Sequence, residues 1–480
     1  MMKKLFSVAL LIALLIPLFA ACSGGGDKGS DAVELTIAAD KTTEYVLVYP
    51  QGATTAEVKA YKDFSAKLRE VTWIFFELKT DAEPPAEGAK EILLGETNRE
   101  ASAQLYTKFG ENQIGFLAKD GQIAIGASYK DGFTTAADEF LSRYAKDNAV
   151  KVMSDLSVRI QCEMGIGYKK VSNTRGIGGD DPWVVEHNGS YYYCWSEGGV
   201  KVAKIDNLDQ INKKNGKQVF SSGESYHNVW APELHYIDGA WYIYVAMCHN
   251  STENADHRMY VLKGTTQDPT DPFRMVGQVK ESSNCWAIDQ TVFQYKGELY
   301  TVWSGWPNQD NANQYLYIAH MKNPTTIDSD RVLISTPSKG YETVTTGPSV
   351  NEGAAVLVQD DRVIVVYSAN GSWTDDYLIT AVYCDDGDLL NPKSWTKLDH
   401  PILSKGVNNY GPGHCSFTTA MDGSLWMIYH ANLQSGTGWN GRSVRIQPMV
   451  WKDGIPTPVG ERATVNLPVP MLVPTTELTD

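Results

Sequence analysis

The sequence predicts a mainly β protein, with a five-bladed β-propeller preceded by a small N-terminal α+β accessory domain. Between residues 165 and 460 a hairpin pattern recurs five times, at intervals of roughly 50 to 64 residues. Before residue 160, strand patterns are mixed with two amphipathic helical patterns. A repeat of this size in an all-β stretch is typical of propeller blades, because each blade buries its faces only against its neighbours.

The five hairpins share one design, in which a strand leads into a tight turn and an aromatic-rich strand returns. In the first hairpin, Trp183–Glu186 precedes Asn188-Gly189 and is followed by Tyr191–Tyr193. Asn-Gly favours such a turn because both of its central residues need positive φ. The turns of the other four hairpins lie at Asp238-Gly239, Lys296-Gly297, Asp360-Asp361 and Asp422-Gly423.

The N-terminal residues are expected to lie outside the folded domains. Two lysines precede an apolar run that ends at Ala21, which is the layout of a signal peptide over residues 1–21. The run ends in Leu-Phe-Ala-Ala-Cys, which resembles a bacterial lipobox and implies lipidation of Cys22. Residues 22–32 are rich in Gly and Ser and predict a flexible tether. We therefore expect an exported protein that meets a bacterial membrane, on its periplasmic or cell-surface face, only through its lipid anchor.

Residues 33–160 predict the accessory domain. Helical patterns cover Thr55–Val71 and Thr134–Tyr144, and strand patterns surround them, including one over Trp73–Leu78. The run Glu91–Arg99, with a later Gly132 and Glu-Phe-Leu, resembles the N-terminal domain of family 20 hexosaminidases and family 67 glucuronidases. No catalytic cluster is evident here, which favours an accessory role.

The composition restricts the class of partner. The net charge is −15, and no basic cluster interrupts the acidic chain. Nucleic acid is therefore excluded, because its binding depends on neutralising phosphates with Lys and Arg, and polyanionic sugars are equally disfavoured. Aromatic residues make up 11% of the chain and fit neutral carbohydrate, whose apolar faces stack on aromatic rings. We expect a monomer that binds a neutral oligo- or polysaccharide. The six cysteines beyond Cys22 could form disulfides or remain buried thiols.

Ionisable residues recur at one depth of the predicted propeller. The first strand of each blade lines the central channel, so residues at one depth of these strands converge on its axis. Asp181 and Asp289 lie eight residues before the second turn residue of their hairpins. Glu352 and His414 lie nine before theirs, and in the second blade the position is Ala231. Three acids that face one pocket would push each other's pKa values apart, which creates a proton donor and a base.

Five motifs, one per blade and in the same order, resemble those of glycoside hydrolase family 43. The resemblance covers roughly residues 165–460 and implies a five-bladed propeller that hydrolyses glycosides with inversion. The motifs are Gly179–Trp183, Trp230–Glu233, Ala287–Asp289, Val350–Gly353 and Gly411–His414.

The resemblance implies a role for each acid. Asp181 would be the general base that activates water, Glu352 the general acid, and Asp289 the residue that orients the acid and raises its pKa. Asp180 is a rival for the base, but Asp181 precedes Pro182, as the base of the family does. An inverting site needs its acid and base about 6.5–9.5 Å apart to admit the water.

The resemblance also implies several binding residues. His414 matches a residue at the propeller centre that often binds a Ca²⁺ ion otherwise surrounded by water, and Arg445 matches an arginine near the substrate. One neutral nitrogen is a weak ligand for Ca²⁺, which prefers oxygens. A surface ion pair is the alternative for Arg445. Trp183, Trp230, Trp286 and Trp306 are possible sugar platforms, with a core role as the alternative for each.

The sequence therefore predicts an inverting glycoside hydrolase that acts on arabinan or arabinoxylan. Cys285–Asp289, Tyr300–Trp306 and Tyr315–Met321 resemble α-L-arabinofuranosidases most, with exo action on α-1,5-arabinan. A β-xylosidase or endo-arabinanase is the alternative among enzymes, and a non-catalytic glycan-binding lipoprotein is the alternative from another class. Residues 461–480 are Pro-rich and predict a C-terminal tail that closes or trails the last blade.

Overall fold

The computed structural model describes residues 32–309, 311–460 and 463–479. The predicted signal peptide and Cys22 lie outside these residues. The described chain forms two compact units: one contains the residues up to Glu163 together with those from Leu472 onward, and the other is Met164–Met471. Within the described ranges, no helix is both long enough and apolar enough to cross a membrane.

The N-terminal unit is built on a sheet with the strand order β3-β2-β4-β6-β5-β9-β32, in which β3, β2, β4 and β6 run parallel. Three further strands form a small sheet of order β1-β8-β7. The elements are β1 (Glu34–Ala38), β2 (Val46–Tyr49), α1 (Thr55–Thr72), β3 (Leu78–Thr80), β4 (Glu91–Leu94), α2 (Glu100–Lys108), β5 (Gln113–Lys119), β6 (Gln122–Ala127), α3 (Phe133–Tyr144), β7 (Ala145–Lys146), β8 (Ala149–Met153), β9 (Ser157–Ser172) and β32 (Thr464–Leu478).

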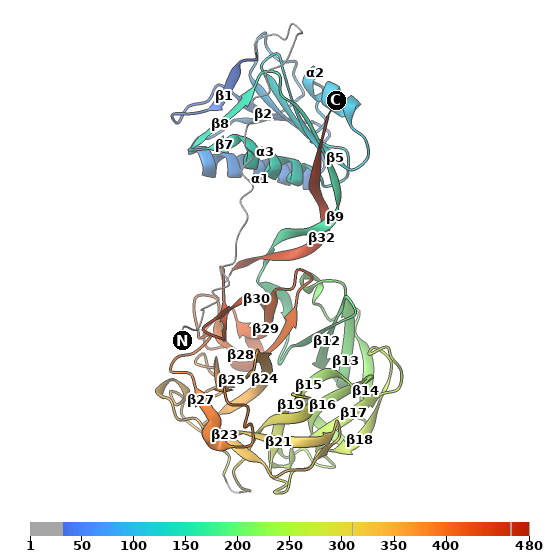
Figure 1. Cartoon of the computed structure of the whole chain (residues 1–480), viewed down its shortest axis with the longest axis vertical. Coiled ribbons are helices and arrows are strands. Elements are labelled where there is room, and N and C mark those ends of the chain that lie inside the picture. The colour runs from blue at the N-terminus through green and yellow to red at the C-terminus, as the bar shows by residue number, and fades with distance from the viewer. Residues whose placement is uncertain (1–31, 310, 461–462, 480) are drawn as a thin grey trace, which may run out of the picture. The chain divides into compact units, whose positions relative to one another are not determined.

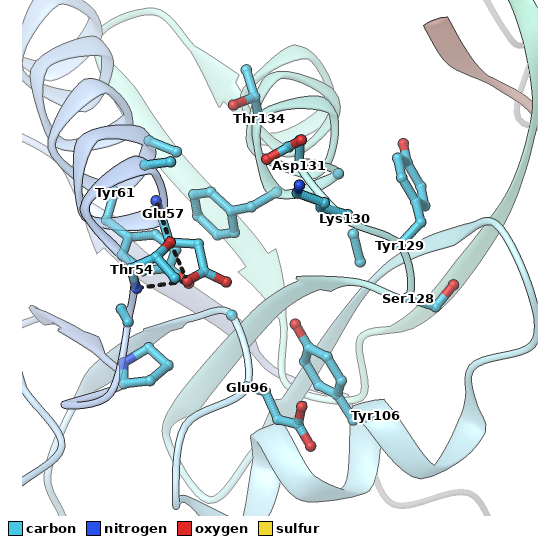
Figure 2. Close-up of a pocket in the computed structure, with 18 of the residues that line it drawn as sticks. Thr54, Glu57, Tyr61, Glu96, Tyr106, Ser128, Tyr129, Lys130, Asp131 and Thr134 are labelled. Carbon is cyan, nitrogen blue, oxygen red and sulfur yellow. Dashed lines mark hydrogen bonds between the residues drawn. The ribbon is translucent and has the colours of Figure 1, made fainter.

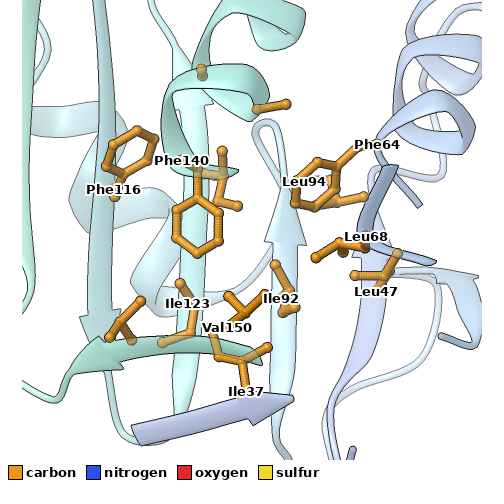
Figure 3. Close-up of a cluster of buried hydrophobic side chains, with 14 of the residues drawn as sticks. Ile37, Leu47, Phe64, Leu68, Ile92, Leu94, Phe116, Ile123, Phe140 and Val150 are labelled. Carbon is orange, nitrogen blue, oxygen red and sulfur yellow. The ribbon is translucent and has the colours of Figure 1, made fainter. Parts of the chain in front are cut away.

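Helices cover both faces of this sheet, with α1 and α3 on one face and α2 on the other (Figure 1). Phe64 of α1 and Phe140 of α3 pack with Ile92 of β4 in the larger core, which Figure 3 shows. The next residue of β4, Leu93, points to the opposite face and packs against Leu105 of α2. This alternation follows from the period of two along a strand.

The structure confirms the two predicted helices of this unit, but one predicted strand is wrong and one further helix is present. Helix α1 begins with a capping box between Thr54 and Glu57, which satisfies backbone donors at its N-terminus. The strand predicted over Trp73–Leu78 is wrong, because Trp73 ends α1 in the left-handed conformation and β3 begins only at Leu78. Helix α2 was not predicted, since its nine residues contain few apolar positions.

The C-terminal segment does not trail the last blade. Residues Thr464–Leu478 form β32, which pairs with β9 at the edge of the seven-stranded sheet. Thr475 donates a hydrogen bond to the carbonyl of Gln161 at 3.1 Å, and Glu477 pairs with Arg143 of α3 at 2.6 Å. The end of the described chain is therefore part of the N-terminal unit.

The second unit is a propeller of five antiparallel blades (Figure 1). Blade one consists of β11 (Trp183–His187), β12 (Ser190–Ser196), β13 (Gly199–Ile205) and β14 (Lys217–Ser221). Blade two consists of β15 (Tyr226–Ile237), β16 (Ala240–His249), β17 (Arg258–Gly264) and β18 (Phe273–Gln278). Blade three consists of β19 (Ala287–Tyr295), β20 (Glu298–Gly305), β21 (Tyr315–Asn323), β22 (Thr326–Ile327) and β23 (Val332–Ser335). Blade four consists of β24 (Asn351–Gln359), β25 (Arg362–Ala369), β26 (Leu378–Cys384) and β27 (Trp395–Lys397). Blade five is β28 (Tyr410–Thr419), β29 (Leu425–Asn432), β30 (Arg442–Lys452), β31 (Ile455–Pro458) and β10 (Thr174–Gly178).

The ring of blades is closed. Strand β10 comes before the first blade in sequence but pairs with β30 of the last blade. Buried apolar clusters lie at all five contacts between successive blades, including the contact between the fifth blade and the first. Short one-turn 3₁₀ helices occur in the loops, at Leu208–Gln210, Asn254–Asp256, Gly340–Glu342, Pro392–Ser394 and Gly438–Gly441. A closed ring fixes the first strand of each blade around one axis.

The cysteines settle one alternative that the sequence leaves open. All six cysteines of the described chain are buried and none forms a disulfide. Burial raises the pKa of the Cys194 and Cys415 thiols, so these groups stay protonated and act as small apolar side chains.

Candidate active site

A cavity of about 460 Å³ opens in the propeller, and every blade contributes to its lining. The predicted Asp181, Asp289, Glu352 and His414 all lie in this lining. The remaining lining residues are Asp180, Ser196, Trp230, Asn254, Trp286, Ile288, Gln314, Ser372, Trp373, Trp439 and Arg442. The propeller therefore brings the three acids and the histidine from four different blades into one pocket.

An unusual backbone conformation places these side chains. Asp181, Ala231, Asp289 and His414 all have left-handed φ, at 46°, 45°, 54° and 44°. The first strands of blades two to five shift register at this place, as at a β-bulge. Each left-handed non-glycine residue costs about 1–2 kcal/mol, so turning these residues out of the regular strand is energetically unfavourable. Such strain concentrates at functional sites.

The fourth blade differs from this pattern by one residue. The residue eight positions before its second turn residue is Gly353, and Gly353 has the left-handed φ of 61°. Glu352 is the preceding residue, so it is not the strict equivalent of Asp181. A Cβ on Gly353 would lie 3.0 Å from Cγ of His414, which explains why this position holds glycine.

Cations surround Asp181. Nδ1 of His414 lies 3.0 Å from Oδ1 of Asp181, and Nη1 of Arg442 lies 3.7 Å from the same oxygen. The backbone N–H of Asp181 donates to Nδ1 of His430 at 3.2 Å. Burial alone would raise the pKa of Asp181, but the charges of His414 and Arg442 outweigh it and hold this pKa well below its ordinary value. Asp181 is therefore ionised at neutral pH.

Glu352 has a different environment. Its side chain is buried, and the hydroxyl of Tyr377 donates a hydrogen bond to its Oε1 at 3.0 Å. Burial, together with the negative charge of Asp289, raises the pKa of Glu352 to about 7. Asp289 accepts a hydrogen bond from the backbone N–H of Gly353 at 2.9 Å, and burial raises its own pKa to about 6.

The pocket thus contains carboxyl groups in opposite protonation states. Near neutral pH, Asp181 can accept a proton, and a large fraction of Glu352 still carries one. A positioned base and a positioned acid in one pocket are the groups that hydrolysis of a glycosidic bond with inversion requires.

Comparison with known proteins identifies the propeller. Residues 178–456, more than half of the chain, match the family model described as glycosyl hydrolases family 43. The chain belongs to this family. The match spans all five blades and includes Asp181, Asp289, Glu352 and His414.

Two curated relatives are similar to the family 43 region. One is alpha-L-arabinofuranosidase 43 of Humicola insolens, 32% identical over 58% of this chain and 62% of the relative. The other is an extracellular exo-alpha-(1->5)-L-arabinofuranosidase of Streptomyces avermitilis, 33% identical over 59% of this chain and 63% of the relative. The chain thus spans less than two thirds of the length of either relative.

Solved structures show the same fold. The crystal structure of alpha-L-arabinofuranosidase from Lactobacillus brevis is 30% identical, with a TM-score of 0.55 over 60% of this chain and 95% of that one. A thermostable family-43 glycoside hydrolase is 24% identical, with a TM-score of 0.52 over 64% of this chain and all of that one.

His414, which the family resemblance implies as a calcium ligand, is engaged by carboxyl groups in this structure. Its Nδ1 contacts Asp181, and Asp181 and Asp289 overcome the effect of burial and raise the pKa of His414 to about 10. A protonated imidazole offers no lone pair to a metal. Within the part of the chain that the structure describes, no group of three His, Cys, Asp or Glu side chains is arranged to hold a metal ion. Calcium stays a prediction, and no step below depends on it.

The four predicted tryptophan platforms separate into two groups. Trp230 and Trp286 line the pocket of this family 43 propeller. Trp306 supports Trp286 from behind, with ring centroids 5.1 Å apart and planes 18° apart. Trp183 lies away from the lining, where its indole N–H donates to the carbonyl of Leu234.

Several residues of the lining are absent from the predicted site, and three of them have large side chains, namely Trp373, Trp439 and Arg442. Trp373 and Trp439 form an edge-to-face pair with centroids 6.3 Å apart, and both are partly exposed. Arg442 donates to Asp180 at 2.9 Å and to the carbonyl of Ser372 at 3.0 Å. The predicted arginine, Arg445, is instead buried within β30 and does not line the pocket.

Sequence spacing alone predicts only part of which residues reach the pocket. Residues 442 and 445 lie three apart on one strand, so their side chains point to opposite faces. The register decides between them: Arg442 starts β30 opposite Asn432, at the end of the blade where Gly178 pairs with Ser443. The two tryptophans lie in loops, where no periodicity predicts the position of a side chain.

Proposed function

We propose that this family 43 protein is an inverting glycoside hydrolase that releases L-arabinofuranose units from neutral plant polysaccharide. One observation carries the proposal: Asp181 and Glu352 lie in one pocket, and their neighbours drive their pKa values in opposite directions. A catalyst of this class needs both an ionised base and a protonated acid at the same pH.

In the proposed reaction, Glu352 donates its proton to the oxygen of the leaving sugar while Asp181 takes a proton from the attacking water. The bond from the anomeric carbon to the leaving oxygen breaks, and a new bond forms to the water oxygen from the opposite face. The net proton transfer runs from water to the leaving group, and the two carboxyl groups return to their starting states by exchange with solvent. The charge of Asp289 keeps the pKa of the acid high.

The substrate class rests on different support. The relatives from Humicola insolens and Streptomyces avermitilis are named as arabinofuranosidases, and the second name specifies exo action on α-1,5 linkages. The pocket is small and partly aromatic, with Trp230 and Trp439 as exposed ring surfaces. We infer an exo-acting enzyme that removes terminal arabinose from arabinan or from arabinoxylan side chains.

The test is product analysis with α-1,5-arabino-oligosaccharides and, in parallel, xylo-oligosaccharides. The proposal expects stepwise release of arabinose by the wild type and a loss of at least 100-fold in the Glu352→Gln variant, because removal of a general acid costs about 10²–10⁴ in rate. Xylose as the product, or internal cleavage of arabinan, would keep the mechanism and change the substrate. Binding without any product from either series would instead identify a glycan-capture protein.

We infer that the protein is exported, since two relatives are named as extracellular enzymes. Lipidation of Cys22, the membrane face and the monomeric state stay predictions. Mass spectrometry of the mature N-terminus would test the anchor: a diacylated or triacylated Cys22 supports it, and an unmodified residue beyond position 22 contradicts it.

A further inference from the structure

A second cavity, of about 950 Å³, lies entirely within the N-terminal unit (Figure 2). It is located where parallel strands β2, β4 and β6 end, because Pro50, Gly95 and Ala127 lie in its lining. Ligands of open sheets with parallel strands bind at this carboxyl edge, where loops diverge and helices begin. The hydrolytic mechanism above makes no use of this cavity.

The lining is rich in aromatic rings and small residues. Tyr61 comes from α1 and Tyr106 from α2, while Tyr129 precedes α3 (Figure 2). The other lining residues that matter here are small, namely Gly52, Ala53, Ala56, Ala60, Gly95, Gly110 and Gly132. Tyr106 and Tyr129 are partly exposed, so a ligand can stack on one of these rings and meet polar atoms at the rim of the cavity.

The hydroxyl of Tyr61 is the most informative atom of the lining. Tyr61 is only 3% exposed, and its hydroxyl has no hydrogen-bond partner among the described residues. It lies against Gly95, where even a Cβ would come within 2.4 Å of it. The hydroxyl is not among the described atoms that are buried without a partner, so it faces the open cavity, where a ligand hydroxyl can pair with it.

The start of α3 supplies further donors to the same cavity. Its N-cap is Gly132, which provides no capping side chain, and no acidic residue occupies its first turn. Thr134 of this turn lines the cavity. By contrast, the start of α1 is closed by the reciprocal bonds of Thr54 and Glu57. The first amides of α3 are therefore available to a ligand oxygen.

The charges around the cavity restrict the ligand. Glu57, Glu96 and Asp131 line it, against the single cation Lys130, and all four side chains are exposed. An excess of carboxylates disfavours phosphates and uronic acids. Aromatic faces, an unpaired hydroxyl and free amides without a cationic cluster favour a neutral polyhydroxylated ring.

We propose that this cavity is a second saccharide-binding site, which takes a neutral sugar unit and is separate from the propeller pocket. The inference goes beyond hydrolysis and does not depend on it, because it rests only on residues of the N-terminal unit. The site would hold the enzyme on glycan without taking part in bond cleavage, since the lining includes no buried carboxyl group.

The test is ligand-observed saturation-transfer NMR and titration calorimetry on the full chain with arabinose, xylose, galactose and, as an anionic comparator, glucuronate. Tyr61→Phe removes only the unpaired hydroxyl and should weaken binding of a neutral sugar about fivefold. Thr134→Trp fills the mouth of the cavity from an exposed position and should reduce binding more than tenfold. Tyr45→Phe is the matched control, because Tyr45 is as buried as Tyr61 but does not line the cavity.

The proposal is supported if at least one neutral sugar loses affinity in Tyr61→Phe and Thr134→Trp but not in Tyr45→Phe. It is overturned if all three variants bind as the wild type does, if no neutral sugar binds, or if glucuronate binds more tightly than the neutral sugars. Thermal unfolding of each variant separates lost binding from lost folding. Because the readout is binding of monosaccharides, the result is independent of whether the propeller hydrolyses arabinan.

Discussion

The two sides of the propeller pocket shift the pKa values of their carboxyl groups in opposite directions. On the side of the first blade, Asp181 has His414 at 3.0 Å and Arg442 at 3.7 Å, and its pKa falls. On the side of the fourth blade, Glu352 has a tyrosine hydroxyl and a second carboxyl group as neighbours, and its pKa rises to about 7. Both groups lie in the same pocket, so depth alone does not decide their protonation.

The charge of the neighbouring groups decides which carboxyl group is the base and which is the acid. Burial opposes ionisation of both groups, but only Asp181 has cations close enough to reverse that effect. His414 comes from the fifth blade and Arg442 from β30 of the same blade. The fifth blade therefore determines which of the two acids becomes the base.

The largest expected effect is that of Asp181→Asn. An amide cannot accept a proton from water, so we expect kcat on arabino-oligosaccharides to fall by about 10³-fold, within the range for loss of a general base. The matched control is Asp180→Asn at the neighbouring position. The side chain of Asp180 is 58% exposed and pairs with Arg442, so its loss should change kcat by less than tenfold. A reversal of the two effects would make Asp180 the base.

A smaller effect, on stability, is expected from Gly353→Ala. Gly353 has a φ of 61°, and a Cβ there would lie 3.0 Å from Cγ of His414. The left-handed conformation costs a residue with a Cβ about 1–2 kcal/mol, and displacement of His414 adds to it, so we expect a loss of about 2–3 kcal/mol in the free energy of unfolding.

Denaturant unfolding measures this loss. The control is Gly297→Ala, because Gly297 is also left-handed, with a φ of 88°, but a Cβ at that position would meet no other atom within 4 Å. It should lose only the conformational part. Equal losses at the two glycines would mean that His414 yields freely and is not held in place by the fourth blade.

Much of this pocket was predictable from spacing in the sequence. A two-residue hairpin turn fixes register, so counting back from Asn188-Gly189 finds Asp181 at the channel. The same count finds Asp289 and, in the fourth blade, Gly353, with Glu352 one residue earlier. Local turn geometry thus carries information on which residues converge from distant parts of the chain.

Other features were not predictable because they depend on tertiary structure. Arg442 and Arg445 belong to the same strand, and only the register with β29 and β10 decides which one reaches the pocket. The Pro-rich sequence of the C-terminal segment predicts a tail, yet the segment forms strand β32 and pairs with β9 at the edge of a sheet. At an edge, proline is tolerated because a strand there has one unpaired side.

The smallest expected effect, and the sharpest test of the two-sided pocket, is a shift in pH dependence in Tyr377→Phe. The acid must be protonated to act, so activity falls as the pH rises through the pKa of Glu352, about 7. The hydrogen bond from Tyr377 stabilises the ionised form and lowers that pKa. Its removal should therefore move the alkaline limb of kcat/KM to higher pH, while the acidic limb, which Asp181 controls, stays where it is.

The matched control is Tyr367→Phe, since Tyr367 is an equally buried tyrosine of the same blade that donates to Glu342, outside the pocket. A shift of both limbs in Tyr377→Phe would show that the two carboxyl groups titrate as one unit. An equal alkaline shift in Tyr367→Phe would show that the neighbours of Glu352 do not set its pKa separately.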